Sequence, residues 1–470
     1  MIFKQCGVST TNSDNNTMKK LILLFAILSI TVSTMAYDFK VNGIFYSIIS
    51  YTSPYTVAVT FESDAGHTYT GNVVIPSSVT YNSISYSVTS IGTFAFGGCL
   101  ELLSVIIPTS VDSIGDGAFY ACIKLPAISI PASVKNIGNY VFFGCGALTD
   151  ISADAANTNF SSVDGVLYNK DKSTLLVYPA GKPDVSYTIA SSVDTIGAYV
   201  FGYCKNLTSI TIPSSVVYIT HAAFMQCNGL TTMFIPASVT FLNNNPFYDC
   251  AGMTAVTVDP ANQYNESVDG VLYQKGLSTI IYYPPAKPGS SYIIPSTVNY
   301  LRSSTFMNCT NLTSVTIPAS VTTIRDHIFS GCRGLTSIYA YPSVPVDLTS
   351  AIETSNDVFM DVDTTNCVLH VPTGSKSLYA SAFQWKGFAN IVEDLTSAVP
   401  PTTATIIKIS VHDGVLQVNG ATMGEAITVY TLQGTTLFSQ KADAANVVIN
   451  LPVKGIYMVK VGAESIKVLN

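Results

Sequence analysis

The sequence IPASVKNIGNYVFFGCGAL, residues 130–148, decides the fold, because close copies of it recur along most of the chain. Its pattern is Ile-Pro-x-Ser-Val-x-x-Ile-Gly-x-x-(Ala/Val)-Phe-x-x-Cys-x-x-Leu. Within each run of copies the cysteines are 23 residues apart. A fixed period of this length predicts a solenoid, in which each unit buries its apolar face against its neighbours. The copies align on the Phe-x-x-Cys step, at Phe96/Cys99, Phe119/Cys122, Phe142/Cys145, Phe201/Cys204, Phe224/Cys227, Phe247/Cys250, Phe306/Cys309 and Phe329/Cys332.

Each copy predicts one coil, with a short strand, a turn and about one helical turn at Ala-Phe-x-x-Cys. A proline such as Pro213 ends the strand, because it cannot donate to the ladder. Successive strands are 23 residues apart except at two coils of 36 residues, so that a unit of 105 residues repeats. We expect the strands to form one continuous sheet. In the long coils, the apolar runs 174–179 and 279–284 predict projecting hairpins.

The start of the chain predicts export. Lys19 and Lys20 precede the apolar run 21–32, and Thr34-Met35-Ala36 offers a small-x-small cleavage site. We therefore expect a signal peptide at residues 1–36, with residues 1–17 an over-extension before a start at Met18. A membrane anchor is disfavoured because the apolar run is short, and a lipoprotein because no cysteine follows the cleavage site.

The remaining segments predict the domain organisation. We expect an N-terminal β cap and first coil at 37–90, the solenoid at 91–341, a C-terminal cap at 342–394 and a proline-containing linker at 395–404. Residues 405–470 alternate apolar and polar residues between turns, which predicts a small all-β sandwich of about seven strands. The expected apolar anchors of the C-terminal cap are Val358, Phe359, Leu369, Val371, Tyr379, Phe383, Trp385, Phe388 and Ile391.

Composition limits the classes of partner. The chain is 48% apolar with a mean hydropathy of +0.37, yet no internal run reaches the roughly 18 residues of a membrane span. We therefore expect no transmembrane segment in the mature chain. Charged residues make up only 11%, the net charge is -7, and no basic stripe is present. These features argue against a nucleic-acid partner.

The candidate chemical groups favour structural roles. Cysteines spaced 23 residues apart do not converge on a metal ion. Neighbouring coils would allow disulfides, but a small buried thiol also packs well, and we expect a reduced ladder. Asp164-Gly165 and Asp269-Gly270 predict turns rather than calcium sites. No nucleophile, P-loop or dinucleotide motif occurs, so we expect no catalytic, cofactor or metal residues and no enzyme activity.

What remains is the outward face of the strands. Hydroxyls beside a few aromatic rings suit a glycan or an extended protein partner. The alternative is that Ser and Thr are simply favourable strand surface residues. The candidate ligand residues are Ser209, Thr211, Thr232, Phe234, Ser314, Thr316, Ser337 and Tyr339.

The repeat closely resembles the BspA-type leucine-rich repeat of bacterial surface proteins, over roughly residues 74–341. Cys367-x-Leu-x-Val-Pro-x-Gly374, with Trp385, is similar to the piece that commonly closes such arrays. The segments 429–434 and 455–461, with Lys467-Val468, resemble C-terminal sorting domains of the type IX secretion pathway. These resemblances imply a secreted or outer-surface bacterial protein that mediates adhesion or protein or glycan binding to a host or microbial surface. The alternative is a structural spacer that binds nothing.

Overall fold

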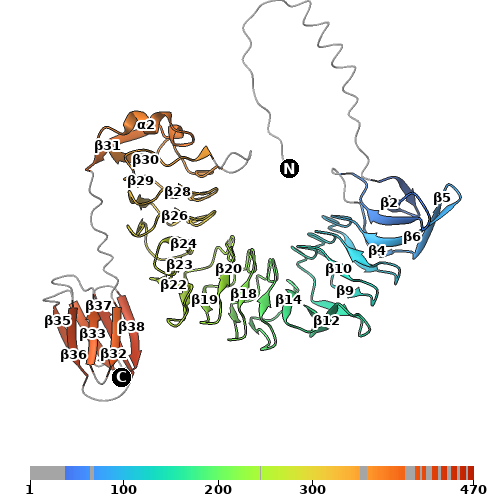
Figure 1. Cartoon of the computed structure of the whole chain (residues 1–470), viewed down its shortest axis with the longest axis horizontal. Helices are drawn as coiled ribbons and strands as arrows, with labels where there is room; N and C mark the ends of the chain where they lie inside the picture. Colours follow the sequence, from blue (N-terminus) through green and yellow to red (C-terminus); the bar gives the residue numbers. More distant parts are fainter. Residues whose placement is uncertain are drawn as a thin grey trace, which may run out of the picture.

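The computed structural model shows a succession of β coils along an arc, together with a separate β domain (Figure 1). It confirms the predicted fold class, a β-rich repeat solenoid followed by a small all-β domain. The predicted signal peptide and nearly all of the predicted linker lie outside the described residues. The described residues are 37–63, 68–243, 245–349 and 357–396, followed by 408–412, 415–419, 426–431, 436–441, 446–451, 456–461 and 464–469.

A mixed sheet covers the first end of the solenoid. Strands β1 (Phe39–Val41), β2 (Ile44–Ser50) and β3 (Thr56–Thr60) form an antiparallel meander, and β3 pairs in parallel with β6 (Ile84–Ile91). Strand β5 (Ser78–Tyr81) is antiparallel to β6. The rings of Phe39 and Tyr81 stack 4.2 Å apart, so aromatic side chains close the open end of the core.

Two kinds of parallel ladder build the coils. Short strands form one kind and come from the Val-x-x-Ile segment of the ordinary coils, and from the apolar runs 174–177 and 279–282 in the two long coils. They are β8 (Ser113–Ile114), β10 (Asn136–Ile137), β14 (Thr174–Val177), β16 (Thr195–Ile196), β18 (Tyr218–Ile219), β20 (Phe241–Leu242), β24 (Thr279–Tyr282), β26 (Tyr300–Leu301) and β28 (Thr323–Ile324). Their sheets run β6-β8-β10, β14-β16-β18-β20 and β24-β26-β28, so the ladder is interrupted before each of the two long coils.

Longer strands form the second kind of ladder. They are β4 (Gly71–Val74), β7 (Leu102–Ile106), β9 (Ala127–Ile130), β11 (Asp150–Ala153), β15 (Ser186–Thr188), β17 (Ser209–Thr211), β19 (Thr232–Ile235), β21 (Ala255–Val258), β25 (Ser291–Ile293), β27 (Ser314–Ile317) and β29 (Ser337–Ala340). The prediction of one continuous sheet is wrong, because these strands divide into several sheets. At each long coil a hairpin lies beside the last strand of the preceding sheet, where the next parallel strand would otherwise pair. In the first long coil, the Ile151 N–H of β11 donates to the carbonyl of Gly165 in the hairpin turn (3.0 Å).

Each long coil contains three antiparallel strands. In the first, β12 (Phe160–Val163) and β13 (Val166–Asn169) form a hairpin, and β13 also pairs with β14. In the second, β22 (Asn265–Val268) and β23 (Val271–Gln274) do the same with β24. The predicted runs 174–179 and 279–284 do form hairpins with the preceding strands, but the expectation that these hairpins project is wrong, because Val166, Leu167 and Tyr168 are buried. Three consecutive apolar residues place side chains on both faces of the strand, so both faces must be covered.

The hairpin turn is formed by Asp164 and Gly165, which have φ values of 50° and 77°. Two successive positive φ values define a type I′ turn, whose twist matches that of the flanking strands. Asp269 and Gly270 repeat it with φ values of 49° and 74°. The Asp-Gly pairs are therefore turns, as predicted.

The Ala-Phe-x-x-Cys step forms a single hydrogen-bonded turn rather than a helix. The Cys99 N–H donates to the Phe96 carbonyl (3.1 Å), and the other copies repeat this bond. Two positions of each coil, two residues before and two after the phenylalanine, have positive φ. The left-handed conformation favours glycine, which occupies Gly98, Gly117, Gly144 and Gly331. The backbone therefore adopts the left-handed conformation twice within five residues, so the turn cannot continue as a right-handed helix.

Stacked phenylalanine rings form the centre of the solenoid. Ring centroids of Phe96, Phe119 and Phe142 are 5.2 and 5.5 Å apart, and Phe201, Phe224 and Phe247 follow at 5.3 Å. The apolar core nevertheless divides into three clusters of buried residues, within residues 39–167, 166–282 and 271–391. The clusters meet at the two long coils, so each 105-residue unit has a core of its own.

A ladder of buried thiols lies beside the rings. Nine cysteines from Cys99 to Cys367 are free and buried. Most of them donate the S–H to the carbonyl of the preceding coil's ring residue, for example from Cys227 to Phe201 at 3.0 Å and from Cys250 to Phe224 at 2.9 Å. Burial raises the pKa of Cys99 to about 11 and that of Cys250 to about 12. These two thiols therefore remain protonated at neutral pH.

We expect these nine thiols to be inert to Ellman's reagent at pH 8 in the native protein and to react fully in urea, because the thiolate is the nucleophile. Cys6 lies outside the described residues and is counted separately from these nine. Folding raises the pKa of the Cys99 thiol, so the buried, protonated thiol stabilises the folded state. This stabilisation is complete below about pH 9 and declines as the pH rises toward 11. Fast reaction of more than one thiol in the native protein would contradict the ladder.

The C-terminal cap continues the ladder instead of ending it. Strands β30 (Val368–Pro372) and β31 (Asn390–Leu395) extend the parallel sheet beyond β29, with helix α2 (Lys376–Ser381) and 3-10 turn η2 (Trp385–Gly387) between them. Trp385 is buried and donates its indole N–H to the Val346 carbonyl (3.0 Å). Among the expected anchors, Phe383 is exposed and the others are buried. No helix in the described part of the chain is long and apolar enough to cross a bilayer.

The last domain has seven strands in two sheets. One sheet is β32-β33-β36 and the other is β35-β34-β37-β38. Leu416, Val418, Val447 and Ile449 from the first sheet share one core with Ile427, Val429, Val459 and Val461 from the second. The bounds are β32 (Lys408–His412), β33 (Val415–Asn419), β34 (Ala426–Thr431), β35 (Thr436–Lys441), β36 (Asn446–Asn450), β37 (Ile456–Val461) and β38 (Glu464–Leu469).

Candidate functional site

The predicted ligand residues lie on the outward face of four strands of the second kind of ladder. Inward residues such as Ile210 and Met233 are buried, and the predicted residues alternate with them. On β17 and β19 all four predicted residues, Ser209, Thr211, Thr232 and Phe234, are exposed, and Phe234 retains 51% of its side-chain exposure. This group provides three hydroxyls around one aromatic ring.

The other four predicted residues form a separate group on β27 and β29, beyond the second long coil. Ser314, Thr316, Ser337 and Tyr339 are half-buried. The ring of Tyr339 stacks on the His370 ring at 4.3 Å, and His370 Nδ1 lies 2.8 Å from the Asp394 carboxylate. The structure thus places the predicted face in two patches, of which the first is the more open.

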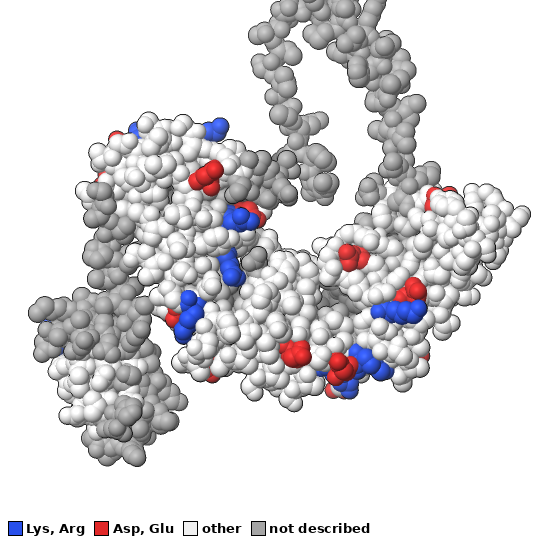
Figure 2. All heavy atoms as spheres, in the orientation of Figure 1, with Lys and Arg blue, Asp and Glu red and all other residues white. Residues whose placement is uncertain are grey.

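Charges are sparse on the surface. Figure 2 shows Lys, Arg, Asp and Glu as isolated or adjoining spots on an otherwise uncharged face. Several are neutralised in pairs, such as Lys124 with Glu101 at 2.6 Å and Arg333 with Asp361 at 2.8 Å. Within the described residues, no three His, Cys, Asp or Glu side chains form a group that could hold a metal ion.

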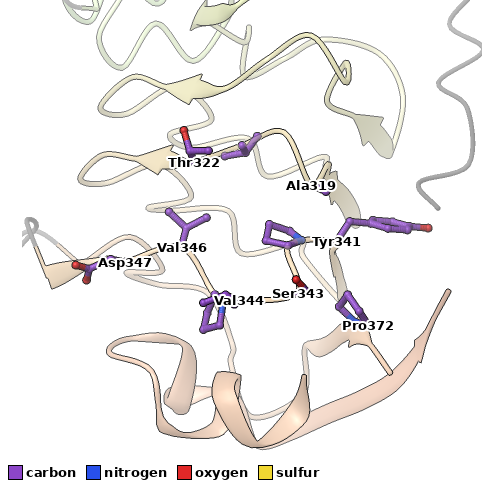
Figure 3. Close-up of a pocket in the computed structure, with 11 residues that line it drawn as sticks. Ala319, Thr322, Tyr341, Ser343, Val344, Val346, Asp347 and Pro372 are labelled. Carbon is purple, nitrogen blue, oxygen red and sulfur yellow. The ribbon is translucent and has the colours of Figure 1, made fainter. Parts of the chain in front are cut away.

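A pocket of about 460 Å³ lies between the last regular coil and the C-terminal cap. In Figure 3, Ala319 and Thr322 come from the coil, and Tyr341, Val344 and Asp347 come from the segment that leads into the cap. Hydrogen bonds from Thr349 lower the pKa of Asp347, so its carboxylate is charged at neutral pH. With no nucleophile and base side by side in its lining, this pocket can accommodate a ligand but offers no catalytic pair.

A cluster of aromatic side chains lies on the turns that follow the short strands. We call it the seam cluster, because it spans the interruption between β10 and β14. Tyr140 contacts Tyr199 with ring centroids 5.6 Å apart, and Phe143 contacts Tyr203 at 4.8 Å. Burial raises the pKa of Tyr199, and the Tyr140 phenol adds to this effect, so the Tyr199 phenol remains neutral at neutral pH. Its members are Phe94, Tyr120, Tyr140, Phe143, Tyr199 and Tyr203.

Sequence reasoning missed the seam cluster because it treated the turn as a spacer between apolar positions. The available signal was a second aromatic residue near the phenylalanine anchor, as in Phe94-x-Phe96, Tyr140-x-Phe142-Phe143 and Tyr199-x-Phe201-x-Tyr203. The sequence could not predict that Tyr140 and Tyr199 are in contact, because a long coil separates them along the chain.

Parallel ladders, stacked rings and 23-residue coils together define a leucine-rich-repeat solenoid of the β-rich kind. Residues 75–173, 184–285 and 286–392 match the model of the BspA type leucine rich repeat region, which covers more than half of the chain. The chain therefore belongs to the BspA-type leucine-rich repeat family.

Solved structures of bacterial leucine-rich-repeat proteins are similar to this chain. A leucine rich cell surface protein from Faecalibacterium prausnitzii is 22% identical, with 78% of this chain and 98% of that chain covered and a TM-score of 0.39. A leucine-rich repeat protein from Eubacterium ventriosum is 25% identical over 60% of this chain and 85% of its own, with a TM-score of 0.39. A leucine-rich repeat protein from Bacteroides ovatus is 24% identical over 77% of this chain and 89% of its own, with a TM-score of 0.36. No curated protein matches the sequence.

Proposed function

We propose that this protein is a non-enzymatic binding protein, secreted or displayed on the outer surface of a bacterium, that mediates adhesion to a protein or glycan. Membership of the BspA-type repeat family supports a surface location. The observation that carries the binding role is the open patch on β17 and β19, where three hydroxyl-bearing residues and Phe234 are exposed on the outward face. Such a patch can stack on a ligand and hydrogen-bond it without charged side chains.

The proposed route to the surface depends on the last domain, whose segments 429–434 and 455–461 resemble sorting domains of the type IX pathway. We expect the full chain to be cleaved by protease added to whole cells of the producing bacterium. A chain ending at Ala398 is expected to stay in the periplasm and to be protected. Equal accessibility of both chains would remove the support for surface sorting and leave the last domain an ordinary β module.

The proposed binding face has its own test, with whole host or microbial cells as the probe. The double variant Phe234→Ala/Tyr339→Ala is expected to weaken cell binding by the purified full chain about tenfold or more, because each aromatic anchor contributes on the order of 1–2 kcal/mol. Thr257→Ala, at the residue paired with Phe234 in the ladder, is the matched control. A structural spacer, the alternative function, would show no binding to lose.

A further inference from the structure

The first long coil leaves a notch in the row of turns. In an ordinary coil the turn has one residue of positive φ two positions before the stacked phenylalanine and another two positions after it. Tyr140 and Gly144 hold these positions around Phe142. In the long coil Tyr178 occupies the ring position, since its N–H donates to the Val200 carbonyl at 2.9 Å, but the strand β14 precedes it directly and Pro179 follows. The two neighbouring coils therefore face each other across the shortened turn.

Aromatic rings form both walls of this notch. Tyr140 and Phe143 come from the coil before it and Tyr199 comes from the coil after it, while Tyr203 supports this wall by contacting Phe143 without lining the cavity itself. A cavity of about 130 Å³ lies between Tyr140–Phe143, Leu176–Tyr178 and Ala198–Val200, and no charged residue lines it. This volume is well below the roughly 300–1,000 Å³ of sites that enclose a drug-sized ligand, so the cavity suits a single small ring.

Two backbone donors, one from the cavity-lining residue Phe142 and one from Gly144 next to the lining, lack acceptors among the described residues. In the preceding coil, Phe119 N–H donates to the Val141 carbonyl at 3.0 Å and Ala121 N–H donates to the Phe143 carbonyl at 2.8 Å. The corresponding N–H groups of Phe142 and Gly144 make no hydrogen bond within the described part of the chain. In regular coils such groups point along the solenoid axis toward the next turn, where the notch now lies. A buried N–H without a partner is costly, and a ligand oxygen can satisfy it.

The second long coil provides an internal comparison 105 residues further on. The positions of Tyr140, Tyr199 and Tyr203 are there occupied by Asn245, Ser304 and Asn308. Asn308 donates to the Asp249 carboxylate at 2.6 Å across this second seam, and Gln226 donates to the same carboxylate at 2.8 Å. Small polar residues therefore bridge the second seam directly, which shows that the frame does not require aromatic walls.

The aromatic walls also carry a backbone cost. Tyr140, Tyr199 and Tyr203 have φ values of 42°, 59° and 65°, in the left-handed region where bulky residues are disfavoured. Equivalent turns have Gly98, Gly117 and Ala222 at these positions. Other coils also have non-glycine residues in this conformation, including Phe94 with a φ of 52°, but this seam gathers three tyrosines in it, and such a concentration of strain is typical of functional sites.

We propose that the notch at the first long coil binds one pyranose ring of a neutral glycan. The C–H face of the sugar stacks on the tyrosine rings, and its oxygens accept hydrogen bonds from the Phe142 and Gly144 N–H groups. An uncharged lining favours a neutral sugar over a carboxylate or phosphate ligand. This site lies on the turns rather than on the strand face, so it stands or falls independently of the patch around Phe234.

The test uses the purified full chain and a panel of neutral hexasaccharides of glucose, mannose, xylose and N-acetylglucosamine, observed by saturation-transfer NMR. We expect transfer to at least one of them. The variant Tyr140→Asn/Tyr199→Ser/Tyr203→Asn, which introduces the residues of the second seam, is expected to raise Kd about tenfold or more because the stacking faces are removed. Its melting temperature checks that it folds, and Tyr203→Phe, which keeps the ring, is expected to retain binding.

Phe234→Ala/Tyr339→Ala on the strand face is the matched control and is expected to leave Kd within about twofold. No transfer to any sugar would overturn the proposal, as would unchanged binding by the triple variant. Loss of binding in the strand-face variant alone would overturn the notch while supporting the strand face as the binding surface.

Discussion

Replacing Phe224 with Ala is expected to lower the free energy of unfolding by about 3–5 kcal/mol, the largest loss we expect from a single ring. Phe224 is fully buried, and its ring stacks between those of Phe201 and Phe247 at 5.3 Å on each side. Because the rings on both sides belong to neighbouring coils held by their own ladders, they cannot collapse into the cavity. Urea unfolding followed by far-UV circular dichroism measures the loss.

The control is Phe234→Ala, ten residues away on the outward face of the same coil. Phe234 is half-exposed, so its removal is expected to change stability by about 0.5 kcal/mol or less. Similar losses for both variants would mean that the burial and stacking of Phe224 contribute little to stability.

A second large effect is expected at Asn157, which holds the first long coil to the coil before it. Its side-chain amide donates to the carbonyls of Pro131 (2.7 Å) and Val134 (3.0 Å), and its oxygen accepts from the N–H groups of Asn159 and Phe160, both at 2.8 Å. All four hydrogen-bonding capacities of the amide are thus used, and the residue is fully buried.

Asn157→Leu removes all four hydrogen bonds. The Pro131 carbonyl still accepts from the Val134 N–H at 3.2 Å. The Val134 carbonyl and the N–H groups of Asn159 and Phe160 lose this partner, each at a cost of about 1–3 kcal/mol when water cannot reach it. We expect a net loss of about 3–5 kcal/mol, after allowance for partial hydration of the site. Asn262→Leu is expected to reproduce the loss, because Asn262 makes the same four bonds in the second long coil. Asn159→Ala, at an exposed position two residues along, is the control. A small effect at both buried sites would show that water replaces the amide.

The periodic part of the fold was predictable because period and burial are local properties of the sequence. The 23-residue step places each phenylalanine and cysteine at one depth in every coil, and the structure stacks them there. Asn157 and Asn262 were overlooked although both follow Asp-x-x at matching places in the long coils. A polar residue at such a position resembles an ordinary turn until the carbonyls it holds, 23 and 26 residues earlier, are known.

The candidate sites were less predictable for the same reason. Alternation along a strand identifies outward residues such as Thr211 and Phe234, and both are exposed. The half-burial of Tyr339 depends on His370, which reaches it only because the C-terminal cap extends the ladder. The notch between residues 140 and 199 forms because the turn of the long coil is short. The repeat pattern alone does not predict the length of that turn.

The division of the apolar core at the long coils has a mechanical consequence. A protein that tethers a cell to a surface is pulled from its ends, and load then passes through the coils in series. Three separately packed blocks joined at two seams should yield one after another, each releasing slack while the others hold. A 105-residue unit would release on the order of 350 Å of chain. In the proposed adhesive role, such stepwise extension would let the protein absorb a sudden pull without unfolding at both ends at once.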